Sequence, residues 1–137
     1  FRAGAFSDTM EVSARWSRLE ALYDAVRKAL GKHVFVMAHF SHAYPDGGSI
    51  YFTFAGAAKD DAEAMEIYDR AWADALAAAV DAGGSLSHHH GVGRSKAPFM
   101  RAEQGEAVGW DADLKRTLDP KSLFNRGTLI PEEVLRG

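Results

Sequence analysis

Two short apolar runs joined by a tight turn constrain the fold of this 137-residue chain more than any other feature. Residues 34–40 and 50–54 are rich in β-branched and aromatic side chains, and such short runs are typical of buried strands. Between them, residues 44–48 (Tyr-Pro-Asp-Gly-Gly) favour a turn, because proline fixes φ and glycine allows positive φ. The sequence therefore predicts a hairpin of two antiparallel strands.

An amphipathic helix is predicted before the hairpin. Apolar residues recur at spacings of three and four across residues 16–30, which places them on one side of a helix. Ser13 is the expected N-cap, since its hydroxyl can accept a hydrogen bond from the first turn, and Gly31 suits a left-handed C-cap. Residues 1–12 show no clear period, so we expect an irregular segment that leads into this helix.

A second and longer helix is predicted after the hairpin. Alanine and larger apolar side chains repeat at helical spacing across residues 64–80. Asp60 or Asp61 is the expected N-cap, because a carboxylate at that position accepts from the first free amides of the helix. Gly83 and Gly84 follow the pattern and are expected to end the helix.

The last third of the chain is predicted to be mostly helical. Shorter helices are expected at about 98–103 and 106–118, and the second ends at Asp119 because proline disfavours helix for the residue before it. Turns are expected within 121–127, followed by a weakly helical tail. The order of helix, hairpin, helix and helical tail indicates the α+β class, and the length fits one domain.

Composition and charge exclude several classes of protein. The chain has no cysteine, which rules out disulfides and thiolate metal sites. Its net charge of −3 argues against a nucleic-acid partner, and no apolar run approaches the roughly 20 residues that span a bilayer. The chain begins with phenylalanine and its first methionine is Met10, so we expect a piece of a longer protein.

Three consecutive histidines, His88, His89 and His90, are the strongest candidates for chemistry. Glycines at 83–84, 91 and 93 flank them, so the backbone of this loop can approach a ligand closely. Imidazoles in such a loop can orient a ligand, donate to an anion or transfer protons near neutral pH. Adjacent side chains point in different directions, so we expect no metal site. A solvated loop without a ligand is the alternative.

Two further groups could take part in binding or proton transfer. Tyr44 follows the first predicted strand, with His42 two residues before it on the same face, and histidines could lower its pKa enough for acid–base work. Packing of Tyr44 on the core is the alternative. Arg94, Lys96 and Arg101 follow the glycines and could bind an anion or form a solvated basic face.

Several motifs together resemble a known family. Residues 83–93 (Gly-Gly-Ser-Leu-Ser-His-His-His-Gly-Val-Gly) are similar to the histidine motif of alkyldihydroxyacetonephosphate synthases. Residues 118–129 are similar to the Asp-Pro…Asn-x-Gly ending of FAD-linked oxidase C-terminal domains. The turn at Tyr44 with the strand at 50–54, and residues 11–16 near the start, match in order and spacing. The resemblance covers nearly the whole chain.

The resemblance implies a part of a flavoprotein of the vanillyl-alcohol-oxidase type. Residues 1–137 would be one fragment, the C-terminal half of a ferredoxin-like cap domain plus the C-terminal helices. The FAD-binding domain would precede it and would hold FAD non-covalently. Such a synthase exchanges the acyl group of acyl-dihydroxyacetonephosphate for a long-chain alcohol in ether-lipid synthesis. We expect a cytoplasmic location, with membrane contact of the parent protein and a homodimer as open alternatives.

The resemblance also implies roles for individual residues of the chain. Its catalytic residues fall on Tyr44, as the acid–base group, and on His88, His89 and His90. Contacts to the cofactor are expected at His90, Gly91 and Asn125. Arg94 is the expected residue for binding of substrate phosphate, because an arginine can bind phosphate through two hydrogen bonds. The isolated chain is expected to be inactive, because it would contain at most half of the active site.

Two other functions remain open at the level of sequence. The first is an FAD-dependent oxidase or dehydrogenase of another small substrate, such as a 2-hydroxy acid. Dehydrogenases of that kind have Glu-His-Gly-Ile-Gly where this chain has residues 89–93 (His-His-Gly-Val-Gly), and the missing glutamate argues against this alternative. The second is a non-catalytic module that binds a metal or another ligand through the histidine loop.

Overall fold

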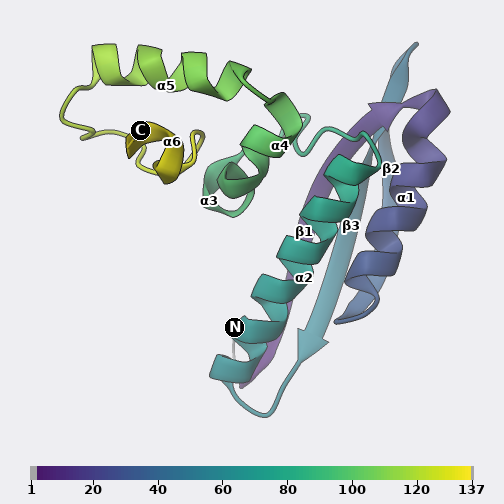
Figure 1. Ribbon diagram of the computed structural model, residues 1–137. Coiled ribbons are helices and arrows are strands. Elements are labelled where there is room, and N and C mark those ends of the chain that lie inside the picture. Colours follow the sequence, from purple (N-terminus) through teal and green to yellow (C-terminus); the bar gives the residue numbers. More distant parts are fainter. Residues whose placement is uncertain (1–2, 137) are drawn as a thin grey trace. The chain divides into compact units, whose positions relative to one another are not determined.

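The computed structural model describes residues 3–136 of the chain (Figure 1). It divides the protein into two compact units, Phe1–His89 and His90–Gly137. The length of 137 residues favoured one domain. The contacts within the chain instead group its residues into a sheet-containing unit and a helical unit. No helix among these residues is both long and apolar enough to span a membrane.

The first unit combines a three-stranded antiparallel sheet with two helices. Its elements, in order, are β1 Ala5–Arg15, α1 Trp16–Leu30, β2 Phe35–Ala43, β3 Gly47–Ala57 and α2 Asp61–Asp81. The strand order is β1-β3-β2, and α1 and α2 pack against each other and against β1 and β3. Ile50, Phe52 and Phe54 of β3 are fully buried and form the centre of the core. The predicted α+β class and hairpin are confirmed.

The first strand, β1, corrects the prediction for the start of the chain. Residues predicted to be irregular pair with β3 along its whole length, and Ser13 lies within this strand instead of capping α1. Met10 and Val12 are fully buried on the helix side, as strand alternation requires. Asp8 interrupts the apolar alternation, and its carboxylate accepts a hydrogen bond from the Tyr68 hydroxyl of α2 (2.6 Å).

The two long helices lie where their apolar periods predict them. The side chain of Asp60 caps α2 by accepting from the Glu63 amide (2.9 Å), so Asp60 is the N-cap of the two candidates. Gly31 follows α1 as predicted, but its φ of −64° is right-handed, so the expected left-handed cap is wrong. Arg15 occupies the N-cap position of α1 without a side-chain cap.

The prediction of burial for the first hairpin strand is wrong. β2 forms as a strand, but eight of its nine residues are exposed and the remaining one is half-buried. β2 lies at the edge of the sheet, whereas β3 lies in the middle between its two partners. Apolar composition therefore predicted the strand correctly but did not reveal its position at the sheet edge. Phe35, Met37 and Phe40 are the large apolar side chains that this edge exposes.

The second unit is helical. It contains α3 Gly93–Lys96, the 3₁₀ turn η1 Ala97–Phe99, α4 Met100–Gln104, α5 Ala107–Leu118 and α6 Glu132–Arg136. Met100, Val108, Ala112 and Ile130 are among its buried apolar residues. The helices predicted at 98–103 and 106–118 are confirmed as η1 with α4 and as α5, with small differences at their ends.

Candidate active site

A row of functional side chains crosses the face of the sheet opposite to the helices. In the register of the sheet, Tyr51 of β3 lies between Glu11 of β1 and His39 of β2. Neighbouring residues of the same strands, Met10 and Phe52, are buried on the helix side, so the row points to the other face. The rings of His39 and Tyr51 lie 5.6 Å apart.

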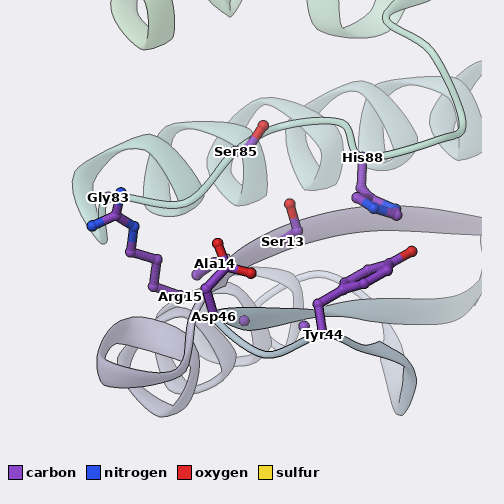
Figure 2. Close-up of a pocket in the computed structure, with 10 residues that line it drawn as sticks. Ser13, Ala14, Arg15, Tyr44, Asp46, Gly83, Ser85 and His88 are labelled. Carbon is purple, nitrogen blue, oxygen red and sulfur yellow. The ribbon is translucent and has the colours of Figure 1, made fainter.

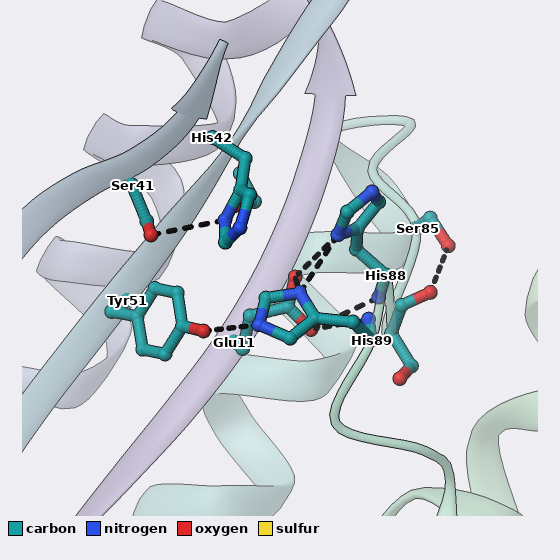
Figure 3. Close-up of polar contacts among 9 residues, drawn as sticks. Glu11, Ser41, His42, Tyr51, Ser85, His88 and His89 are labelled. Atoms are coloured by element: carbon teal, nitrogen blue, oxygen red, sulfur yellow. Dashed lines mark hydrogen bonds and ion pairs between the residues drawn. The ribbon is translucent and has the colours of Figure 1, made fainter. Parts of the chain in front are cut away.

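The loop after α2 brings two histidines over this row. Ser13 of β1 and Ser85 form an isolated β-bridge, with N–H···O distances of 3.0 and 2.7 Å. The bridge holds the loop beside the free edge of β1, and the fully buried Leu86 anchors it next to the bridge. His88 and His89 follow at once and reach across Glu11, as Figure 3 shows.

Glu11 is the centre of the polar cluster. Its side chain is fully buried, and Oε2 accepts hydrogen bonds from the backbone amides of His88 (2.9 Å) and His89 (3.4 Å). Its Oε1 lies 3.8 Å from Nδ1 of His88 and 3.6 Å from Nδ1 of His89. A carboxylate is costly to bury unless donors surround it, and these amides and imidazoles supply that environment.

The imidazoles of the loop contact one another and Tyr51. Nδ1 of His88 lies 2.8 Å from Nδ1 of His89, within hydrogen-bonding distance. Nε2 of His89 forms a short hydrogen bond with the Tyr51 hydroxyl. Tyr51 and Glu11 therefore lie on opposite sides of the same imidazole ring (Figure 3).

A bulge in β2 adds His42 to the cluster. The register shifts between Phe40 and Ala43, and such a bulge redirects the following side chains. Nδ1 of His42 forms hydrogen bonds with the hydroxyls of Ser41 (3.0 Å) and Ser49 (3.4 Å). The His42 ring lies 4.7 Å from that of His89, which places it beside the loop.

The predicted catalytic Tyr44 lies next to these histidines. Its ring stacks on His42 at 6.2 Å and an interplanar angle of 11°, and it lies 5.2 Å from the ring of His88. The backbone of Tyr44 is held on both sides, because its amide donates to Gly47 (2.8 Å) and its carbonyl accepts from the Trp16 indole (2.9 Å). The turn therefore presents this tyrosine in a defined position.

A pocket of about 540 Å³ opens beside Tyr44 and His88. Figure 2 shows these two side chains facing each other at one end, with Arg15 and Asp46 farther along the pocket. Its size is within the range of small-molecule sites. Arg15 is a cation of this pocket that the sequence analysis did not single out.

The other predicted site residues belong to the second unit. His90 begins that unit, so the three consecutive histidines are divided between the two units. His90, Gly91, Arg94 and Asn125 are all exposed. Arg94 lines a separate hollow of about 250 Å³ that also contains Glu132 and Glu133.

Asp119 explains the Asp-Pro motif near the end of the chain. Its carboxylate accepts from the backbone amides of Leu123 (2.9 Å) and Phe124 (3.0 Å) and pairs with Lys115. The Lys115 ammonium, followed by these two amides, lowers the pKa of Asp119 to about 2. The carboxylate thereby closes the turn that presents Asn125 with a φ of +47°.

Glu11 and Tyr51 are the residues that sequence reasoning missed. Glu11 lay in the segment predicted to be irregular, and Tyr51 was assigned only to a strand. The available signal was the alternation of Met10 and Val12 with polar neighbours, which predicts a strand with Glu11 on its other face.

Glu11, His88 and His89 also form a group whose ligand atoms all lie within 4.8 Å of one another, so they could hold a metal.

Comparison with known proteins identifies the family. Residues 1–129 match the family described as "FAD linked oxidases, C-terminal domain". The chain belongs to this family. An alkyldihydroxyacetonephosphate synthase of Trypanosoma brucei brucei is 32% identical to this FAD linked oxidase C-terminal domain over 135 residues. The match covers 92% of the chain and 22% of the relative.

Two further relatives show the range of the family. An alkyldihydroxyacetonephosphate synthase of Dictyostelium discoideum is 33% identical, with 90% of the chain and 21% of the relative covered. The glycolate oxidase subunit GlcD of Bacillus subtilis is 25% identical, with 85% and 24% covered. The chain therefore spans about a fifth to a quarter of the length of these relatives.

Proposed function

We propose that this FAD linked oxidase C-terminal domain supplies the proton-transfer and anion-binding groups of an alkyldihydroxyacetonephosphate synthase-like enzyme. The observation that carries the proposal is the cluster of Tyr44, His42, His88 and His89 beside a pocket of about 540 Å³. The similarity to two synthases at 32% and 33% identity supports the choice of substrate. The substrates would be acyl-dihydroxyacetonephosphate and a long-chain alcohol.

Tyr44 is the proposed acid–base group of the reaction. A proton on the carbon next to a ketone is weakly acidic, so its removal needs a positioned base. The centroid of the Tyr44 ring lies 6.2 Å from that of His42 and 5.2 Å from that of His88, and these imidazoles can accept or return the proton that the hydroxyl transfers. His88 and His89 would also hold the anionic oxygens of the leaving carboxylate or of the phosphate.

The exposed residues of the second unit fit contact with a cofactor. Gly91 has a φ of +77°, and a Cβ there would meet no atom within 4 Å, so a planar ligand could approach on that side of the residue. His90 and Asn125 are exposed as well, and we propose that these three residues contact FAD. Bound FAD supplies the electron sink that stabilises charge on the substrate carbon.

Replacement of Tyr44 tests the proposal. In the full-length protein, we expect Tyr44→Phe to lower turnover of acyl-dihydroxyacetonephosphate with a long-chain alcohol by at least about 100-fold, the usual contribution of a general acid or base. The flavin absorption spectrum should not change. Tyr23→Phe is the matched control, because the Tyr23 ring packs on the buried Phe52 and on Phe40 of the edge strand β2. Full turnover by Tyr44→Phe would remove this tyrosine from the mechanism.

The alternative is an FAD-dependent oxidase or dehydrogenase of a 2-hydroxy acid. The 25% identity to a glycolate oxidase subunit is the observation that favours it. Flavin bleaching by a panel of 2-hydroxy acids under anaerobic conditions would support this alternative. Exchange of the acyl group without net flavin reduction would support the synthase.

A further inference from the structure

We propose that Glu11, His88 and His89 form a binding site for a divalent transition-metal cation, with Zn²⁺ as the favoured ion. His88 and His89 also take part in the proposed synthase reaction, so binding of the ion is measured in the absence of substrate. Each of the three residues offers one ligand atom, and these atoms all lie within 4.8 Å of one another. Figure 3 shows the carboxylate and the two rings turned toward one another.

The spacing of the three ligand atoms suits a tetrahedral ion. Zinc binds imidazole nitrogen and carboxylate oxygen at about 2.0–2.2 Å, so two ligands of a tetrahedral site lie about 3.3 Å apart. The two Nδ1 atoms are 2.8 Å apart, and Oε1 is 3.8 and 3.6 Å from them. One of these distances is shorter and two are longer than the ideal spacing of about 3.3 Å. Both imidazoles are partly exposed, and movements of about 0.5 Å would bring the three ligand atoms to that spacing.

The surroundings hold the ligands in the orientation that a metal requires. The amides of His88 and His89 bind Oε2 of Glu11, which fixes the carboxylate with Oε1 toward the imidazoles. Nε2 of His89 bonds to the Tyr51 hydroxyl. When Nε2 carries the proton and donates it to Tyr51, Nδ1 presents its lone pair to the ion, as in most metal-ligating histidines.

The donor chemistry selects the class of ion. Two imidazoles and one carboxylate suit zinc and other first-row transition metals, whereas magnesium and calcium prefer ligand sets made entirely of oxygen. A divalent cation would also place positive charge beside the buried carboxylate of Glu11, which lowers the cost of burying it. Three protein ligands also leave one position for water or an oxygen of a bound anion, as in catalytic zinc sites.

Metal titration of the full-length, tag-free protein tests the site. After treatment with a chelator, Zn²⁺ is titrated by calorimetry in the absence of substrate, and we expect one tight site per chain. Glu11→Gln keeps the side-chain volume but removes the charged ligand, and we expect it to weaken zinc binding at least 100-fold. Tyr51→Phe removes the partner of His89, and the expected loss is about 10- to 100-fold.

His39→Asn is the matched control, because His39 lies in the same row of the sheet but outside the ligand group. It should bind zinc as the unmodified protein does. Circular dichroism of every variant verifies that the fold is retained. The proposal is overturned if the folded protein binds no stoichiometric zinc, or if Glu11→Gln and His39→Asn bind it equally well. Tyr44→Phe changes none of the three ligands, so its effect on synthase turnover tests the proposed function separately from zinc binding.

Discussion

Replacing Glu11 with alanine should detach the histidine loop from the sheet. The buried carboxylate of Glu11 is the acceptor for the amides of His88 and His89, at 2.9 and 3.4 Å. Alanine removes this acceptor and leaves two donors of the loop above an apolar side chain. The Ser13–Ser85 bridge and the buried Leu86 remain, so the loss should be confined to the loop after residue 86.

The loss in free energy of unfolding caused by Glu11→Ala can be estimated from the two hydrogen bonds that it removes. A bond to a charged acceptor contributes about 1.5–3 kcal/mol, and the bond at 3.4 Å contributes less than the one at 2.9 Å. We therefore expect Glu11→Ala to lower the free energy of unfolding by about 2–4 kcal/mol. Glu11→Gln retains an acceptor of the same size and should cost about 1 kcal/mol.

Hydrogen exchange measured residue by residue is the appropriate assay, because it separates the loop from the rest of the protein. In Glu11→Ala, the amides of His88 and His89 should lose protection, while those of α2 should change only by the global loss of stability. Urea unfolding gives the total cost. If both amides exchange as slowly in Glu11→Ala as in the unmodified protein, the carboxylate does not hold the loop.

Two further predictions concern the second unit and the hairpin turn. The pKa of Asp119 is lowered to about 2 by Lys115, so the stability from this contact should be present above about pH 4 and lost as the pH falls toward 2. Acid unfolding should show this loss, and Asp119→Asn should abolish that part of the pH dependence. A Cβ at Gly47 would lie 2.3 Å from the Ala14 carbonyl oxygen, so Gly47→Ala should destabilise the protein by about 1–3 kcal/mol in urea unfolding. Gly109→Ala, where a Cβ meets no atom within 4 Å, should be neutral or slightly stabilising instead.

Local patterns were sufficient to predict the helices and the hairpin. The apolar periods of residues 16–30 and 64–80 lie within single elements, so no distant contact was needed to recognise them. β1 was missed because Asp8 interrupts its alternation. The hydroxyl that satisfies Asp8 belongs to Tyr68, 60 residues later in the chain. A charged residue on the helix side of a strand is tolerated only with such a partner, and a local pattern does not contain it.

Residues of the candidate site also differ in whether local sequence is enough to recognise them or a contact with a distant residue is needed. His88, His89 and Tyr44 were recognised because their motifs are continuous in sequence. Glu11 was not recognised, because its role arises only when the loop returns along β1 and places His88 beside it, 77 residues later. Tyr51 acquires its role in the same way, through the bond to His89. Sequence reasoning therefore found the groups on the loop and missed the sheet residues that orient them.

The packing of the core and the geometry of the site depend on the same register. Met10 and Val12 are buried beneath the helices only if Glu11, between them, points to the other face beside Tyr51. A slip of one residue between β1 and β3 would expose both apolar side chains and bury the carboxylate on the helix side, and each change is costly. The hydrophobic core thus selects the register that delivers Glu11 to His88 and His89.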